Sequence, residues 1–174
     1  YFAEKFARER REFVAHIARV LELAGEAPAE ARTHADAIAG LETALAENSK
    51  LPAELRDRIA NYHKMTLAEA KAAYPQIPFG PFLDRLGIPA GTTHLVVGQP
   101  AFLAGLSKLL ENRPLTEWKL YLRWHLLRAS SPYLSAALED ESFRFFSTVL
   151  SGTPEQEPRW QRAARVVNAQ IGDA

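Results

Sequence analysis

Apolar residues recur every three or four positions along most of this chain, which is the spacing of one face of an α-helix. The first stripe predicts a helix that Gly25 ends, and the second predicts a helix that opens at Pro28 and stops at Asn48. Only His94–Val97 fits a short strand. Further stripes predict helices over residues 66–74, 82–86, 100–112, 115–129, 132–150 and 154–171.

The helix predicted over residues 115–129 carries apolar residues on two sides, with Lys119 and Arg123 in a narrow polar stripe between them. A helix of this kind is normally covered on both sides, so we expect it to be the central helix. Its two apolar faces are Leu115, Trp118, Leu122, Leu126 and Ala129, and Leu120, Trp124 and Leu127.

Two segments have the spacing of a helix cap. Thr66 and Glu69 form a potential capping box, and Met65 with Ala70 forms the hydrophobic staple beside it. Residues 153–156 repeat the same logic before the last helix. We therefore expect helix starts at both places.

Composition agrees with a helical chain, because alanine and leucine far outnumber valine and isoleucine. The 174 residues, 47% hydrophobic and 24% charged, suit one globular domain over residues 1–174. We predict an all-α fold, orthogonal or bundle-like, with about seven to eight helices and at most one short strand.

Charge and cysteine content narrow the possible partners. Twenty-one basic residues balance 21 acidic ones, so no strong field favours nucleic acid or an anionic membrane. The absence of cysteine excludes disulfides and thiol catalysis. Residues 86–107 carry no Asp, Glu, Lys or Arg, but Pro89, Pro100 and several glycines argue against a membrane span. We expect no nucleic-acid partner and no membrane span in this segment.

No catalytic or metal-binding set emerges from the residues alone. None of the five histidines belongs to a His-Glu-x-x-His motif, and His16 and His125 lie on or beside apolar helix faces. The acidic run at residues 139–141 is better explained as a solvated helix face than as acid-base machinery. The aromatic residues between Trp118 and Arg128 fall on apolar faces, which favours core packing over base stacking. We assign no catalytic residue and no metal ligand, and substrate-binding residues stay unassigned.

Three segments, in order, carry a family resemblance. Residues 61–69 (N-Y-H-K-M-T-L-A-E) resemble a Y-N-K-M-T-L segment, and residues 122–127 (L-R-W-H-L-L) resemble L-R-W-R-L-L. In the third segment, residues 150–156 resemble L-S-G-T-x-E-Q and residues 159–168 resemble R-W-x-R-C-x-x-x-V-N. Together they resemble the helical N-terminal region of the neprilysin family of zinc metallopeptidases, in its bacterial form. Ala163 stands where animal members have cysteine, and His63 replaces an asparagine.

The resemblance implies a non-catalytic helical region of a secreted or envelope zinc endopeptidase. Such a region would cover the active-site cavity and limit substrate size. The partners would be the C-terminal catalytic half of the same protein and peptide substrates. Zinc would lie in that half, with no cofactor in this chain, and the location would be extracytoplasmic. The alternative is a free-standing helical interaction or scaffold module without peptidase activity.

The motif residues have mostly structural explanations. Thr66 and Glu69 would cap a helix, Gly152 would end one in the left-handed conformation, and Trp160 would fill a core. Spacing gives Arg162 and Asn168 no role. The residues carried over from the resemblance are Lys64, Met65, Thr66, Glu69, Arg123, Trp124, Gly152, Trp160, Arg162 and Asn168.

Apolar stripes also lie near both ends of the chain. Phe2 and Phe6 begin the first helix, and Trp160, Val167 and Ile171 belong to the last. If the protein continues beyond both ends, as the resemblance implies, part of their packing partner is absent. We therefore expect apolar surface near both termini, or weak self-association.

Overall fold

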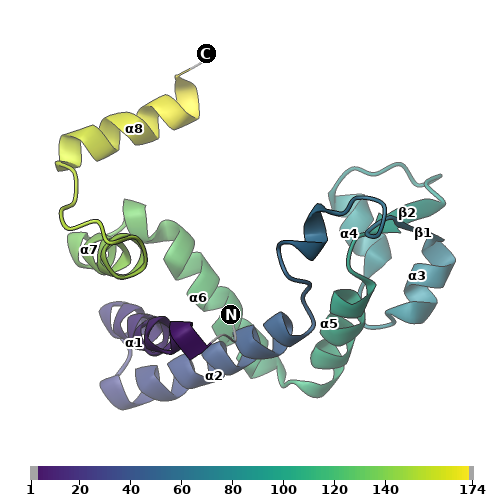
Figure 1. Ribbon diagram of the computed structural model, residues 1–174, viewed down its shortest axis with the longest axis horizontal. Coiled ribbons are helices and arrows are strands. Elements are labelled where there is room, and N and C mark those ends of the chain that lie inside the picture. Colours follow the sequence, from purple (N-terminus) through teal and green to yellow (C-terminus); the bar gives the residue numbers. More distant parts are fainter. Residues whose placement is uncertain (1–3, 173–174) are drawn as a thin grey trace. The chain divides into compact units, whose positions relative to one another are not determined.

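The computed structural model describes residues 4–172 and is mostly helical (Figure 1). This confirms the predicted all-α class. The α-helices are α1 (Ala7–Leu23), α2 (Pro28–Glu47), α3 (Leu67–Ala73), α4 (Phe79–Arg85), α5 (Pro100–Asn112), α6 (Leu115–Ser130), α7 (Ala136–Phe143) and α8 (Arg159–Ile171). The 3-10 helices are η1 (Glu4–Phe6), η2 (Glu54–Arg56) and η3 (Ser131–Tyr133), and η4 (Arg144–Val149) is a π-helix. The strands are β1 (His63–Thr66) and β2 (His94–Val97).

The chain forms two compact units. Unit 1 contains the residues up to 36 and those from 123 onward, and unit 2 contains residues 37–122. Both boundaries fall inside long helices, α2 and α6. The single-domain prediction for residues 1–174 stays a prediction. At the first helix end, Gly25 has φ +97°, a value that side-chain-bearing residues rarely adopt, so it ends α1 as expected.

The small sheet has one strand more than the sequence predicted. His94–Val97 is a strand, as expected, and it pairs antiparallel with His63–Thr66, from His63 opposite Val97 to Thr66 opposite His94. A strand needs a partner for its backbone groups, so the prediction of at most one is corrected to two. β1 was missed because four residues give too little alternation, and the helix cap that follows dominates the local pattern.

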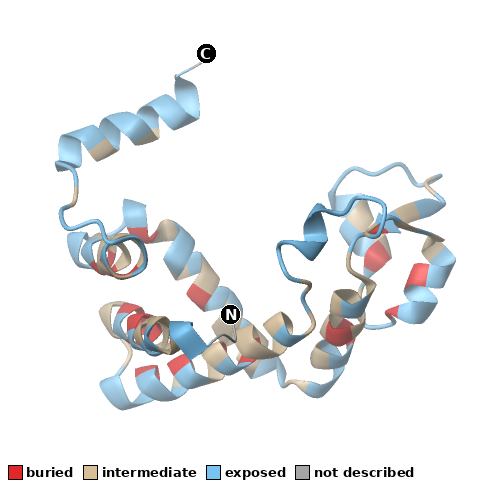
Figure 2. Ribbon diagram, in the orientation of Figure 1, coloured by how far each residue is buried: buried red, intermediate tan, exposed pale blue. Residues whose placement is uncertain are grey.

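Unit 2 has its core beside this sheet. Ala70 and Tyr74 from α3 and the segment after it pack with Phe79 of α4 and Val97 of β2. Met65 is half-buried against the same cluster, to which Ala70 belongs, and this is compatible with the predicted hydrophobic staple. Figure 2 shows the buried residue of α3 on an otherwise mostly exposed helix, and the buried residues of α5 among half-buried ones.

Unit 1 has an aromatic core under α1, which packs on α7 and η4. Trp124 is fully buried, and so is Ile17 of α1. The His16 ring stacks on Phe145 with centroids 4.7 Å apart and meets Trp124 edge-on at 5.5 Å. Phe13 also contacts Trp124 edge-on, at 6.1 Å. Helices distant in sequence therefore meet around one tryptophan.

A network of ionisable side chains reaches from this aromatic core to the surface. His16 Nδ1 is 2.7 Å from Glu141 Oε1, and both residues are buried. Arg144 donates to both oxygens of Glu141, at 2.8 and 2.9 Å, and to Glu12 at 3.1 Å. Burial alone would raise the pKa of Glu141, but the hydrogen bonds from His16 and Arg144 outweigh it and lower that pKa. The same bonds to Glu141 and Glu12 raise the pKa of Arg144.

Three local predictions are corrected. The helix predicted over residues 132–150 is divided into η3, α7 and η4. No cap forms at Thr153, whose backbone N–H donates to Ser147 and whose carbonyl accepts from Thr148. The last helix starts only at Arg159, after Pro158. The backbone groups of Thr153 thus belong to the end of η4 and not to the start of a new helix.

Residues 4–172 cover the predicted central helix on one side only. In α6 Trp124 is buried, whereas Leu115, Leu122 and Leu126 are 68%, 64% and 67% exposed. Helix periodicity shows which sides of α6 are apolar. It cannot show whether residues of this chain pack against both of those sides.

We predict that Thr66→Ala lowers the free energy of unfolding by about 1 kcal/mol, because the side chain caps α3. Denaturant unfolding should show a lower midpoint with an unchanged slope. Thr33→Ala is the matched control, since its exposed hydroxyl only bonds back to Ala29 within a helix. An equal loss in both variants would contradict the capping role.

We also predict that Glu141→Gln costs about 2 kcal/mol near neutral pH, since Arg144 and His16 lose a charged acceptor. The folded pKa of Glu141 lies below its ordinary value of 4.5, so its contribution is present above that value. As the pH falls through the lowered pKa, the contribution is lost. The free energy of unfolding, measured at a series of acidic pH values, should therefore change less with pH in Glu141→Gln than in the wild-type protein.

Glu22→Gln serves as the control for that experiment. Its partner Arg19 is three residues away and largely exposed, so the change should cost less than about 0.5 kcal/mol. A Glu141→Gln protein with wild-type stability and wild-type acid sensitivity would show that the network contributes nothing to folding.

Candidate functional site

The first motif forms the connection from β1 into α3. Lys64 lies in β1 opposite Val96, and its side chain is exposed. Thr66 Oγ1 accepts from the Glu69 backbone N–H at 3.1 Å, and the Glu69 carboxylate accepts from the Thr66 N–H at 2.7 Å. Both halves of the predicted capping box are present.

The Glu69 carboxylate is committed to this cap. Hydrogen bonds from the backbone N–H and the hydroxyl of Thr66 lower the pKa of Glu69. His94, on the paired strand, adds a smaller effect in the same direction. A carboxylate held in its charged form by a helix start is suited to structure rather than to proton transfer.

The second motif holds unit 1 together. Arg123 forms an ion pair with Glu26, and Glu26 also lies 2.7 Å from His34 Nδ1. Trp124, the next residue, is the largest fully buried side chain of the described chain. The motif therefore ties α6 to the first two helices of unit 1.

The third motif ends η4 and forms α8. Gly152 has φ +71°, as expected for a left-handed helix end. Arg162 donates to Glu139 at 2.7 Å, which joins α8 to α7. Asn168 is exposed, and its backbone carbonyl accepts from Gly172.

Trp160 contradicts its predicted role. It was expected to fill a core, but it is 70% exposed on α8. Figure 2 shows α8 exposed along most of its length. The stripe is amphipathic, as the spacing indicated, yet the described residues leave its apolar side uncovered.

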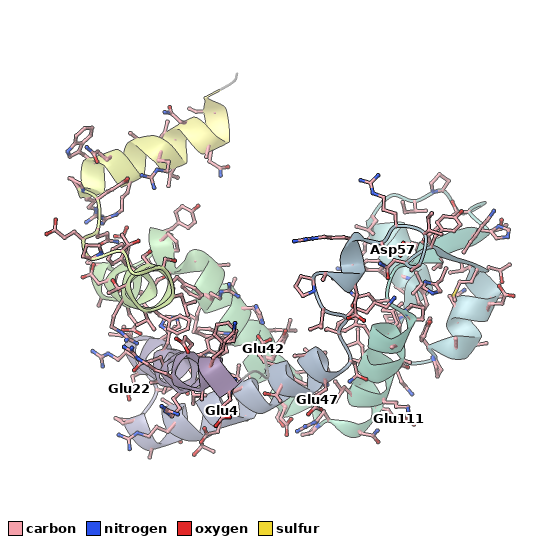
Figure 3. The ribbon with its side chains drawn as sticks, in the orientation of Figure 1. Glu4, Glu22, Glu42, Glu47, Asp57 and Glu111 are labelled. Atoms are coloured by element: carbon pink, nitrogen blue, oxygen red, sulfur yellow. The ribbon has the colours of Figure 1, made fainter. Side chains whose placement is uncertain are left out.

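The motif residues do not converge on one site. Lys64, Met65, Thr66 and Glu69 belong to unit 2, and the other six belong to unit 1. Within residues 4–172 no three His, Cys, Asp or Glu side chains are grouped so that they could hold a metal ion. The acidic side chains labelled in Figure 3 come from separate elements, η1, α1, α2, α5 and the segment after η2. No helix among the described residues is long and apolar enough to cross a membrane.

Unit 2 contains an apolar slot that the sequence analysis missed. Its volume is about 720 Å³. It is bordered by Leu55, Asn61, Ile77, Pro78, Phe79, Phe82, Leu83, Leu95, Val96, Val97, Gly98, Gln99, Phe102, Leu103 and Leu106. Much of the lining comes from residues 86–107. Their lack of charge was considered above only in relation to a membrane span. The absence of charge was the sequence signal available for an apolar slot. The sequence could not show that α4 and η2 border the same space, because that depends on the folded chain.

Known proteins resemble this chain over most of its length. Endothelin-converting enzyme 1 of Mus musculus is 31% identical over 128 residues, which is 71% of this chain and 16% of that enzyme. Neutral endopeptidase of Lactobacillus helveticus is 26% identical over 155 residues, 89% of this chain and 24% of that protein. This chain therefore spans less than a quarter of either relative.

Solved structures of known proteins also match this chain. Zinc metalloprotease Zmp1 of Mycobacterium tuberculosis, in complex with an inhibitor, matches 99% of this chain with a TM-score of 0.92 and 31% identity. Its open state matches with a TM-score of 0.90. In both, this chain covers 27% of the longer protein.

The sequence profile of peptidase family M13 matches residues 1–174, the entire chain. The profile, the relatives and the fold agree along the same residues. The protein therefore belongs to peptidase family M13 and corresponds to that family's N-terminal domain.

Proposed function

We propose that this chain is the non-catalytic helical region of a zinc metalloendopeptidase, and that it covers the active-site cavity and limits substrate size. The observation that carries the proposal is the match of 99% of the chain to a zinc metalloprotease more than three times as long. The zinc and its ligands would lie in the C-terminal part of the longer protein. Peptides would be the substrates, and the location would be extracytoplasmic.

The exposed apolar surface of unit 1 supports a partner of this kind. Trp160, Val167 and Ile171 are exposed on α8, and Leu126 is exposed on α6. Exposed patches of large apolar residues usually mark interaction surfaces. The catalytic part of the same protein is the partner that accounts for both helices.

The physical role of such a helical region would be to enclose a hydrolytic centre. A wall of packed helices keeps bulk water away from the reacting groups and admits only what fits the cavity. The buried Glu141 network and the Thr66 cap would make each unit stiff enough to act as such a wall.

We predict that the 174-residue chain neither hydrolyses peptides nor binds zinc with submicromolar affinity, because hydrolytic zinc needs three protein ligands and an open position. Zinc titration and a quenched-fluorophore peptide assay measure both. The longer protein, which should carry His-Glu-x-x-His beyond residue 174, should do both.

A substrate ladder tests the size limit in the longer protein. One cleavable core peptide is flanked by glycine-serine tails of increasing length, and kcat/KM is measured for each. We expect kcat/KM to collapse above a threshold length. Equal cleavage of short peptides and of a folded carrier protein bearing the same core would contradict the cavity. A longer protein without peptidase activity would favour the scaffold alternative.

We further predict that the isolated chain self-associates weakly through its terminal apolar surface. Phe6→Glu and Ile171→Glu should each reduce the apparent mass in light scattering across a concentration series, since both side chains are exposed. Leu51→Glu, at an exposed residue of unit 2, is the control and should change nothing. A strictly monomeric wild-type chain would contradict this prediction.

A further inference from the structure

β2 has a free edge. The Leu67 backbone N–H donates to the Thr93 carbonyl across the sheet. Hydrogen-bonded pairs alternate with non-bonded pairs along antiparallel strands, so in this register the hydrogen-bonded residues of β2 are Leu95 and Val97. The Lys64–Val96 pair lies between them, and its backbone groups point away from the partner strand. The pair Thr66–His94 follows the same rule, because the Thr66 N–H bonds to the Glu69 side chain instead of to β2.

The far-facing groups of β2 have no partner strand. The sheet of the described residues has two strands, β1 and β2. Among the described backbone hydrogen bonds outside helices and strands, none involves Val96 or Gly98. Val96 is also 51% exposed. An edge of this kind is a template for another extended backbone.

The apolar slot runs along this edge. Five consecutive residues, Leu95 to Gln99, border it, whereas no residue of β1 does. Side chains of a strand alternate between its two faces, so a wall of consecutive residues belongs to the edge of the strand. The opposite walls come from α4 and α5, with Phe82 at 55% exposure among them.

The lining specifies the chemistry of the occupant. It contains no Asp, Glu, Lys, Arg or His, and its polar side chains are Asn61 and Gln99. Both are already engaged, because Lys50 donates its Nζ to Asn61 and its backbone N–H to Gln99. None of the residues that border the slot offers a charged group to a charged occupant. An uncharged one would bury apolar side chains while its backbone pairs with β2.

We propose that β2 and the apolar slot bind an extended, uncharged peptide segment by strand addition, and that this segment is part of the peptide substrate. The identification of the occupant as substrate rests on the proposed function. In strand addition the main-chain hydrogen bonds supply affinity, and the pocket selects side chains at alternate positions. The site would hold a stretch of substrate away from the bond that is cut, and such remote contacts contribute to substrate selection.

The binding test uses a dye-labelled probe, acetyl-Thr-Val-Thr-Leu-Thr-Val-Thr-amide, titrated against the 174-residue chain by fluorescence anisotropy. We expect saturable binding below about 1 mM. A probe of the same sequence with alternate backbone nitrogens methylated should bind at least roughly tenfold more weakly, since it cannot donate to β2. A probe with glutamate in place of both valines should also lose binding.

Two proline variants test the edge itself. Val96→Pro removes a far-facing N–H that does not hold the sheet together, and proline is tolerated at such edge positions. Lys64→Pro removes the equivalent N–H from the opposite edge and is the matched control. We expect roughly tenfold weaker probe binding for Val96→Pro and less than about twofold change for Lys64→Pro. Phe82→Glu should also abolish binding, whereas Ile59→Glu, at an exposed residue outside the slot, should not.

Hydrogen exchange on the wild-type chain gives a readout that needs no variant. Bound probe should slow exchange of the Val96 and Gly98 amides and leave the Lys64 amide unchanged. No binding, equal binding of the methylated probe, or protection at Lys64 instead would each overturn the site. Binding by the 174-residue chain but not by the longer protein would overturn the substrate assignment, because the protein's own chain would then fill the slot. None of these measurements uses zinc or catalysis, so an inactive longer protein would refute the proposed function without removing the peptide site.

Discussion

The burial of one carboxylate organises unit 1. Glu141 lies 125 residues from His16 in sequence, yet the two side chains share a hydrogen bond of 2.7 Å beneath α1. A buried charge without partners would be strongly destabilising, so α7 can pack on α1 only if His16 and Arg144 reach the carboxylate. Arg144 does so because η4 directly continues α7 and keeps it one turn from Glu141. The aromatic rings of Phe145 and Trp124 then close over the histidine.

Unit 2 depends on a different constraint, the pairing of two four-residue strands. β1 passes directly into α3 through the Thr66 cap, and β2 is followed by α5 after only Gly98 and Gln99. The pairing therefore fixes where both helices start. It also leaves the outer edge of β2 along the apolar slot, because the register turns the backbone groups of Val96 away from β1.

The uncovered apolar faces of α6 and α8 have the same physical explanation. Both helices have regular apolar stripes, and both leave large side chains such as Leu122 and Trp160 exposed. A stripe of this regularity is typical of a helix that packs on something. The chain matches 27% of the Zmp1 structures, and the proposal made above is that the rest of such a longer protein packs on these faces.

The sequence by itself determined what depends on near neighbours. Helix periodicity, the Thr66–Glu69 cap and the helix ends at Gly25 and Gly152 were all predictable, because each involves residues within a few positions. The three motifs were also sufficient for the family, which the profile match over residues 1–174 confirmed.

Only the tertiary structure decided what depends on distant partners. β1 needed β2 to exist as a strand, Glu141 needed His16 to be buried, and the slot needed α4 and α5 to meet. Trp160 was placed in a core because its spacing marks an apolar face, and spacing carries no information about what covers that face. Local pattern fixes which side of an element is apolar, whereas burial depends on which other surface is present to pack against it.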